Sequence, residues 1–188
     1  MKGLQFSASI MSMIPLIAMA SPAWSDVKIE DTKNSYEIRG LTTEAIHNDI
    51  MKNAPREGDD IIDGETLDKI TWSLNYSTED KECHVTSDSV RLQLKMTLPT
   101  WIDESRASPK VRAAWDAYLL ALRGHEYEHK AIAVKAAHAV DRLIHSDRSG
   151  GSCNVLNARL NDAAEKIVAE GEREQDRLDS NARSFDIE

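Results

Sequence analysis

The 188-residue chain is poor in cysteine, in basic charge and in long apolar runs. Two cysteines, Cys83 and Cys153, stand 70 positions apart, a spacing that does not suggest a zinc ribbon. Acidic residues outnumber basic ones by 32 to 23, which argues against nucleic acid or an anionic membrane as a main partner. No segment after residue 25 is apolar enough to cross a membrane, so a protein that works outside a bilayer is expected.

The first 25 residues have the pattern of a bacterial export signal. Lys2 precedes an apolar stretch at residues 10–20 that is too short to span a bilayer comfortably. Small-x-small cleavage sites end at Ala20 and Ser25, and the polar chain that begins at Asp26 favours the second site. The alternative is a short uncleaved membrane anchor. We therefore expect residues 1–25 to be a signal peptide, and residues 26–188 to form one periplasmic or secreted domain without stable membrane insertion after cleavage.

In an oxidising compartment, Cys83 and Cys153 most simply form one disulfide. The bond would close a loop of about 70 residues and stabilise the fold by up to roughly 4 kcal/mol in the chain-entropy description. Two buried free thiols are the alternative. A structural role is expected in both cases.

The sequence predicts a small antiparallel sheet in the first half of the domain. Residues 36–39 form a short strand candidate. Apolar and polar residues alternate over residues 70–76 and again over residues 90–98, which is typical of half-buried strands. A bulge or turn is expected at residues 87–89, and Pro99 is expected to end the last strand.

Helix signals dominate the remainder of the chain. Thr42 or Thr43 can cap a first helix, and Ser108 followed by Pro109 is a strong helix start. Gly150 follows the second helix, as is common beyond a helix end. The expected helices cover residues 43–53, 109–146 and 154–178. Together the elements predict an α+β fold in which a small antiparallel sheet precedes a long helix and a C-terminal helix.

Within the long helix, residues 125–129 read His-Glu-Tyr-Glu-His, which is the H-E-x-x-H pattern of zinc peptidases. His125 and His129, four residues apart, share one helix face and can hold one Zn²⁺, while Glu126 can act as a base on water. A lone buried histidine is usually satisfied by one hydrogen bond, but two within one turn, beside a glutamate, favour a shared cation.

At 100° per residue, both histidines lie within the apolar stripe of the helix and Glu126 lies on its flank. The stripe contains Val111, Ala114, Trp115, Tyr118, Leu122, Ile132, Ala136, Val140 and Leu143. The charged residues expected on the opposite face are Arg112, Asp116, Arg123, Lys130 and Asp141.

A catalytic zinc site needs a third protein ligand. Glu174, and as second choice Glu170, lie on the apolar face of the last helix, so either could complete the site. The alternative for both is simple solvation near the helix end. The remaining histidines have no spacing that recruits them to the site: His47, His84, His138 and His145.

Several weak motifs occur in a fairly specific order across nearly all of the domain. They are Tyr36-x-x-x-Gly40, Trp72, Cys83, Leu98-Pro99-x-Trp101, Trp115-x-x-Tyr118, the H-E-Y-E-H segment and Cys153. In these residues the chain resembles the bacterial family catalogued as domain of unknown function 922, described as predicted secreted Zn-dependent proteases. The resemblance implies a zincin-like metallopeptidase domain.

One part of the chain departs from the family pattern. Many members end with a tyrosine-aspartate pair, then a threonine and a histidine-glycine pair. Here the corresponding stretch begins at Leu178-Asp179, and Ser184 stands in place of the histidine. If that histidine is a ligand in the family, this chain must use another group or has lost catalysis.

We therefore expect an exported zinc-dependent metallopeptidase that acts on a peptide or protein substrate in the cell envelope, with Glu126 as general base. By analogy with zincins, residues 90–98 would line the cleft and pair with extended substrate. The alternative is a non-catalytic zinc-binding or structural envelope protein with a degenerate protease site. Zinc-dependent amidase action on cell-wall peptides would use similar ligands.

Overall fold

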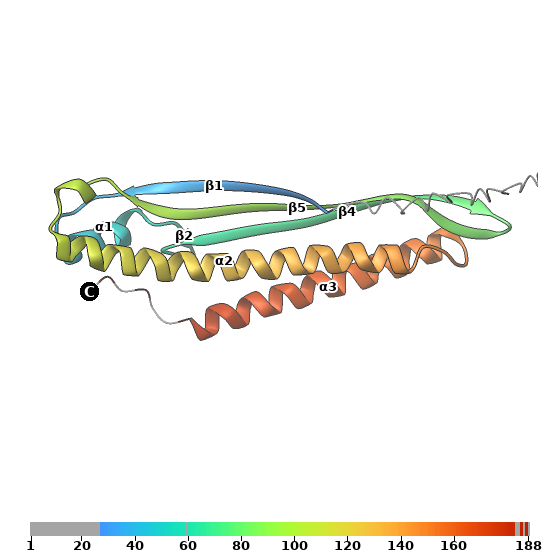
Figure 1. The fold of residues 1–188 in the computed structure, drawn as a ribbon. Helices are drawn as coiled ribbons and strands as arrows, with labels where there is room; N and C mark the ends of the chain where they lie inside the picture. The colour runs from blue at the N-terminus through green and yellow to red at the C-terminus, as the bar shows by residue number, and fades with distance from the viewer. Residues whose placement is uncertain (1–26, 59, 183–184, 186, 188) are drawn as a thin grey trace, which may run out of the picture.

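The computed structural model describes residues 27–58, 60–182, 185 and 187. The predicted signal peptide lies outside these residues. The described chain is elongated, with a long sheet running beside two long helices (Figure 1). The elements in chain order are β1 (Lys28–Ile38), α1 (Thr43–Asn53), β2 (Arg56–Glu57), β3 (Asp60–Ile61), β4 (Glu65–Glu79), β5 (Glu82–Trp101), the 3₁₀ turn η1 (Glu104–Arg106), α2 (Pro109–Ser146) and α3 (Cys153–Asn181).

The predicted α+β class is confirmed, but the antiparallel sheet is a correction, because the three-stranded sheet is mixed. Its order is β1-β5-β4, with β1 parallel and β4 antiparallel to the central strand β5. The sequence predicted only the end of β1, at residues 36–39. The preceding residues of β1 are mostly charged or polar and largely exposed, as befits an edge strand, so they show no alternation.

Strand β5 continues past Pro99 to Trp101, contrary to the prediction that Pro99 ends it. Pairing of β5 with β4 stops at Glu65 opposite Thr97, so among the described strands Pro99 pairs with β1 alone, at Tyr36. A proline, which has no N–H to donate, is tolerated at such a one-sided position. The bulge is present but falls at Thr86, because Asn75 pairs with Ser87 and Tyr76 with Val85.

The helix starts agree closely with the predictions. Thr42 caps α1 by accepting from the backbone N–H of Ala45, and Ser108 caps α2 by accepting from that of Val111. Helix α2 ends at Ser146 as expected. Helix α3 is one residue longer at its start and three longer at its end than predicted, reaching Asn181. These last residues matter for the site described below.

Cys83 and Cys153 form a disulfide, as the sequence predicted. Backbone hydrogen bonds reinforce the link, since Cys83 donates to the Gly151 carbonyl and accepts from the Gly150 N–H, both at 3.0 Å. The bond therefore fastens the β4–β5 hairpin to the α2–α3 connection. No helix in the described part of the chain is long and apolar enough to cross a membrane.

One face of the sheet packs on α2 and α3, and α1 closes the end where α2 begins (Figure 1). Because α2 contacts the sheet on one side and α3 on another, its buried arc is wider than one apolar stripe. The prediction that Lys130 and Asp141 lie on the exposed face of α2 is therefore wrong. Asp141 is 9% exposed, and Lys130 forms an ion pair with Asp31 of β1.

Candidate metal centre

Helices α2 and α3 bring together three side chains that can ligate a metal. Nε2 of His125 and Nε2 of His129 lie 3.1 Å apart. Oδ1 of Asp179 lies 3.1 Å from the first nitrogen and 2.8 Å from the second. The histidines come from successive turns of α2, and Asp179 comes from the last turn of α3. All three potential ligand atoms therefore converge on one point.

The orientation of His129 is fixed by a chain of hydrogen bonds. The side-chain nitrogen of Gln175 donates to Oδ1 of Asp68 at 2.6 Å, which turns the amide oxygen of Gln175 toward His129. That oxygen lies 2.7 Å from Nδ1 of His129, so Nδ1 carries the proton and donates. With Nδ1 as the donor, Nε2 is the ring nitrogen that faces the cluster. This is the tautomer that an Nε2 metal ligand requires.

The donor set fits a divalent cation such as Zn²⁺. Two imidazole nitrogens and a carboxylate oxygen within 2.8–3.1 Å repel one another unless a proton or a cation lies among them. Tetrahedral zinc, with bonds of about 2.0–2.1 Å, places its ligand atoms about 3.3 Å apart. Two histidines with one carboxylate also leave one position for water or substrate.

Glu126 lies beside the cluster and is 2% exposed. Its Oε2 has no hydrogen-bond partner among the described residues. Burial raises the pKa of the Glu126 carboxyl, an effect that Thr66 and the two histidines partly oppose. The sequence placed Glu126 on the flank of the buried face, whereas the structure buries it more completely than His129.

Gly64 lets the chain pass directly over Glu126. A Cβ at position 64 would stand 3.0 Å from Oε1 of Glu126 and 2.9 Å from Cδ1 of Leu122, so any side chain there would press on the glutamate.

The residue before Gly64, Asp63, accepts hydrogen bonds from two tyrosine hydroxyls. Tyr36 donates to its carbonyl oxygen and Tyr118 to its carboxylate, at 2.7 and 2.9 Å. Burial raises the pKa of both phenols, which keeps them protonated as donors.

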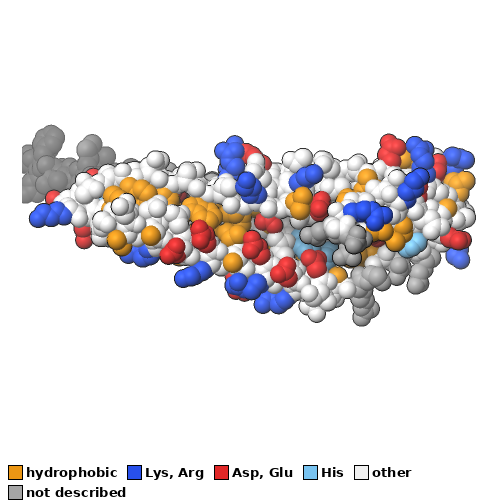
Figure 2. All heavy atoms as spheres, turned by 180° about the vertical axis from the view of Figure 1, so that it is seen from behind, with side chains coloured by type: hydrophobic (Ala, Val, Ile, Leu, Met, Phe, Trp, Pro, Cys, Tyr) orange, Lys and Arg blue, Asp and Glu red, His pale blue; other side chains and the backbone are white. Residues whose placement is uncertain are grey.

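The cluster lies in a cleft of about 700 Å³. Residues from α1, the β2–β3 hairpin, the start of β4, α2, α3 and Phe185 line it, and they include both histidines, Glu126 and Asp179. Histidine surface is visible near the middle of the face seen in Figure 2, close to acidic side chains. The centre is therefore open to solvent on one side while its base is buried.

The structure does not bring the predicted third ligand to the histidines. Both carboxylate oxygens of Glu174 contact Nζ of Lys135, at 2.7 and 3.0 Å. Glu170, the second choice, pairs instead with Arg173 and Arg177. The cause is the direction of the two side chains on α3. Gln175 and Asp179, one turn apart, face His129, whereas Glu174 faces Lys135 further along α2.

Asp179 had two signals in the sequence. It stands where the family pattern has the aspartate of its tyrosine-aspartate pair, and it lies one turn beyond Gln175 on the same side of α3. Ser184, which stands in place of the family histidine, lies outside the described residues. His47, left without a role by the sequence, lines the cleft, whereas His145 belongs to a separate cluster.

Comparison with known proteins gives a family but no activity. Residues 33–185 match the family described as "Bacterial protein of unknown function (DUF922)". No curated protein and no solved structure matches the chain. The match covers most of the sequence, so the chain belongs to this bacterial family of proteins of unknown function.

Proposed function

We propose that this protein is an exported zinc metallopeptidase with a zincin-like site. The observation that carries the proposal is the convergence of His125, His129 and Asp179 beside a buried glutamate in an open cleft. Two histidines and one carboxylate are a ligand set of catalytic zinc in peptidases. The Cys83–Cys153 disulfide supports an oxidising compartment outside the cytoplasm.

Zinc, when bound by these three residues, would supply Lewis acidity that lowers the pKa of water and polarises a peptide carbonyl. Glu126 would take the proton from the attacking water and pass it to the leaving amine. Its burial supports this role, because a raised pKa brings the carboxylate nearer to the working pH of a general base. Gln175 would hold His129 in its ligating tautomer.

The substrate would pair with the edge of β4 and not with residues 90–98 as first expected. β5 already has a partner strand on each side. β4 is an edge strand, and its residues Glu65, Thr66 and Leu67 line the cleft next to Glu126. An extended peptide added at this edge would lie across the ligand cluster with its backbone hydrogen-bonded.

The test is zinc content together with peptide cleavage, measured on protein that starts at Asp26. We expect about one zinc per chain, cleavage of members of a broad peptide library that includes cell-wall peptides, and loss of cleavage by about 10²–10⁴-fold in Glu126→Gln with zinc retained. Asp179→Asn should lower zinc affinity, and Glu174→Gln is the matched control that should not. Protein without stoichiometric zinc would contradict the proposal.

The second candidate is a non-catalytic zinc-binding envelope protein. The sequence favours it at one position, because Ser184 stands in place of the family histidine, and a chain that lacks a family ligand could bind zinc without turnover. Wild-type protein that binds zinc but cleaves neither polypeptides nor cell-wall peptides would favour this candidate. Cleavage of cell-wall peptides alone would identify the amidase form of the same chemistry.

A further inference from the structure

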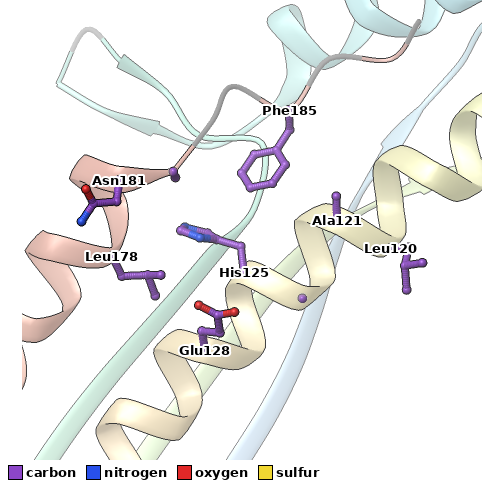
Figure 3. A pocket seen from close by; sticks show the side chains of 9 residues that line it. Leu120, Ala121, His125, Glu128, Leu178, Asn181 and Phe185 are labelled. Atoms are coloured by element: carbon purple, nitrogen blue, oxygen red, sulfur yellow. The ribbon is translucent and has the colours of Figure 1, made fainter.

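Helix α2 has a second apolar surface, on the side that faces away from the sheet. Leu120 is 74% exposed and Tyr127 is 44% exposed, although both are large side chains with extensive apolar area. At 100° per residue the two lie within about 20° of each other and opposite the buried Leu122. Leu120 also extends away from Leu178 and Phe185 (Figure 3). Large apolar side chains that share one exposed face indicate a protein interface.

Most other residues on this face are small. The exposed positions that lie near Leu120 and Tyr127 around the helix are Ala113, Ala117, Gly124 and Ala131. A Cβ at position 124 would meet nothing within 4 Å, so the fold of one chain does not require a glycine there. Glycine weakens a helix relative to alanine, and its use here leaves room for the backbone of a second helix.

Four exposed charged residues border this face in a self-complementary pattern. Asp116 and Arg123 lie on one side of Leu120, about 40° and 60° around the helix. Lys110 and Glu128 lie on the other side, both about 80° around. None of the four forms an ion pair with another described residue. In both pairs the midpoint between acid and base falls at residues 119–120, so a two-fold axis there places each acid opposite the base of a second, antiparallel copy.

We propose that this face of α2 is the interface of a homodimer, in which the α2 helices of two copies pack antiparallel about a two-fold axis near Leu120. Asp116 pairs with the partner's Arg123 on one side of the contact, and the reverse pair forms by symmetry. On the other side Lys110 pairs with the partner's Glu128. Because the same surface serves both copies, the association closes at two chains.

The apolar contacts fit the same axis. Tyr127 packs over the partner's Ala113, so that a large side chain meets a small one, and the two copies of Leu120 meet at the axis. The cleft lies on the opposite side of α2, where His125 and Glu126 line it. Dimerisation therefore leaves the candidate metal centre open, and the inference does not depend on the proposed function.

Sedimentation equilibrium of protein that starts at Asp26 tests the association, and wild type should dimerise in the micromolar range. Asp116→Arg and Arg123→Asp each bring like charges together at two symmetric positions, so each should weaken dimerisation by at least about 10-fold. The double variant restores opposite charges and should recover most of the wild-type affinity. Asp162→Arg, the same reversal at an exposed position of α3, is the matched control and should change nothing.

Leu120→Cys checks the geometry, because the native Cys83 and Cys153 are bonded to each other and leave no other free thiol. The introduced thiols meet at the axis and should form an intermolecular disulfide under mild oxidation. Leu67→Cys, at a leucine that is 50% exposed on β4, should not. The inference is overturned if wild type is monomeric at about 100 μM, if neither charge reversal weakens the dimer, or if both cysteine variants cross-link equally.

Discussion

Helix α2 takes part in two clusters that combine histidine with carboxylate, and the two differ in the cationic side chains that contact them. The first contains His125, His129 and Asp179, and the second contains Asp88, Asp141 and His145. In both clusters the potential ligand atoms lie within 4.8 Å of one another. Residue type and spacing alone therefore do not separate them.

The difference lies in what else contacts each cluster. In the second, Nη1 of Arg148 lies 2.8 Å from Oδ1 of Asp88, and the same guanidinium donates to the Val85 carbonyl. Nδ1 of His145 lies 2.9 Å from the backbone carbonyl of Asp141 and donates to it. The Arg148 contacts fasten the segment that follows α2 to β5. Around the first cluster no lysine or arginine contact is found among the described residues, and a cleft opens onto it.

The nearest cation therefore separates the roles of two otherwise similar histidine–carboxylate clusters. Where the protein supplies its own guanidinium, the carboxylate is already compensated and the contact is structural. At the first cluster no such cationic side chain is found among the described residues, and Gln175 fixes a histidine tautomer, which favours the proposed metal ion.

Removing one histidine from each cluster is the strongest way to break this comparison. His129→Ala should lower zinc affinity by well over 100-fold, since loss of a direct ligand costs more than loss of an outer-shell partner. His145→Ala should leave zinc affinity unchanged. Titration with a competing zinc chelator measures both, and equal losses in the two variants would contradict the assignment.

A smaller effect is expected from the outer contact of the first cluster. Gln175→Ala frees the Nδ1 proton of His129 and should lower zinc affinity by about 10- to 100-fold without removing a ligand. Gln175→Glu supplies a stronger acceptor and should restore most of that affinity. If both substitutions leave zinc affinity at the wild-type value, Gln175 does not orient the ligand.

The smallest effect is expected at the second cluster. Arg148→Met should destabilise the fold by about 1 kcal/mol, because it removes a charged donor from Asp88 while water can partly replace a side chain that is 34% exposed. Urea unfolding measures this difference. Zinc affinity should not change, and a drop in zinc affinity would show that the second cluster binds metal too.

Much of the helical framework could be predicted because its signals are local. Thr42 and Ser108 are helix-capping residues that mark the starts of α1 and α2. The alternation of apolar and polar residues at 70–76 and 90–98 indicates strands with one buried face. The motif put both histidines on the inner side of α2. Most of edge strand β1 was not predicted, because a mostly exposed strand has no alternation of apolar and polar residues.

The third ligand could not be derived from helix periodicity alone. It depends on how α3 crosses α2, and that crossing is set by Gly171, where a Cβ would stand 3.2 Å from Cβ of Ala136. It also depends on α3 continuing past Leu178, where the sequence ended it. Those additional residues include Asp179, so a small error in a helix end concealed the ligand.

His125, His129 and Asp179 are proposed to hold one metal ion. The most direct measurement is an anomalous difference map at the zinc absorption edge, from crystals of the protein starting at Asp26 grown with equimolar zinc. We predict one peak, bounded by Nε2 of His125, Nε2 of His129 and a carboxylate oxygen of Asp179. Absence of a peak there, or a peak at Glu174 or at the Asp88 cluster, would contradict the claim.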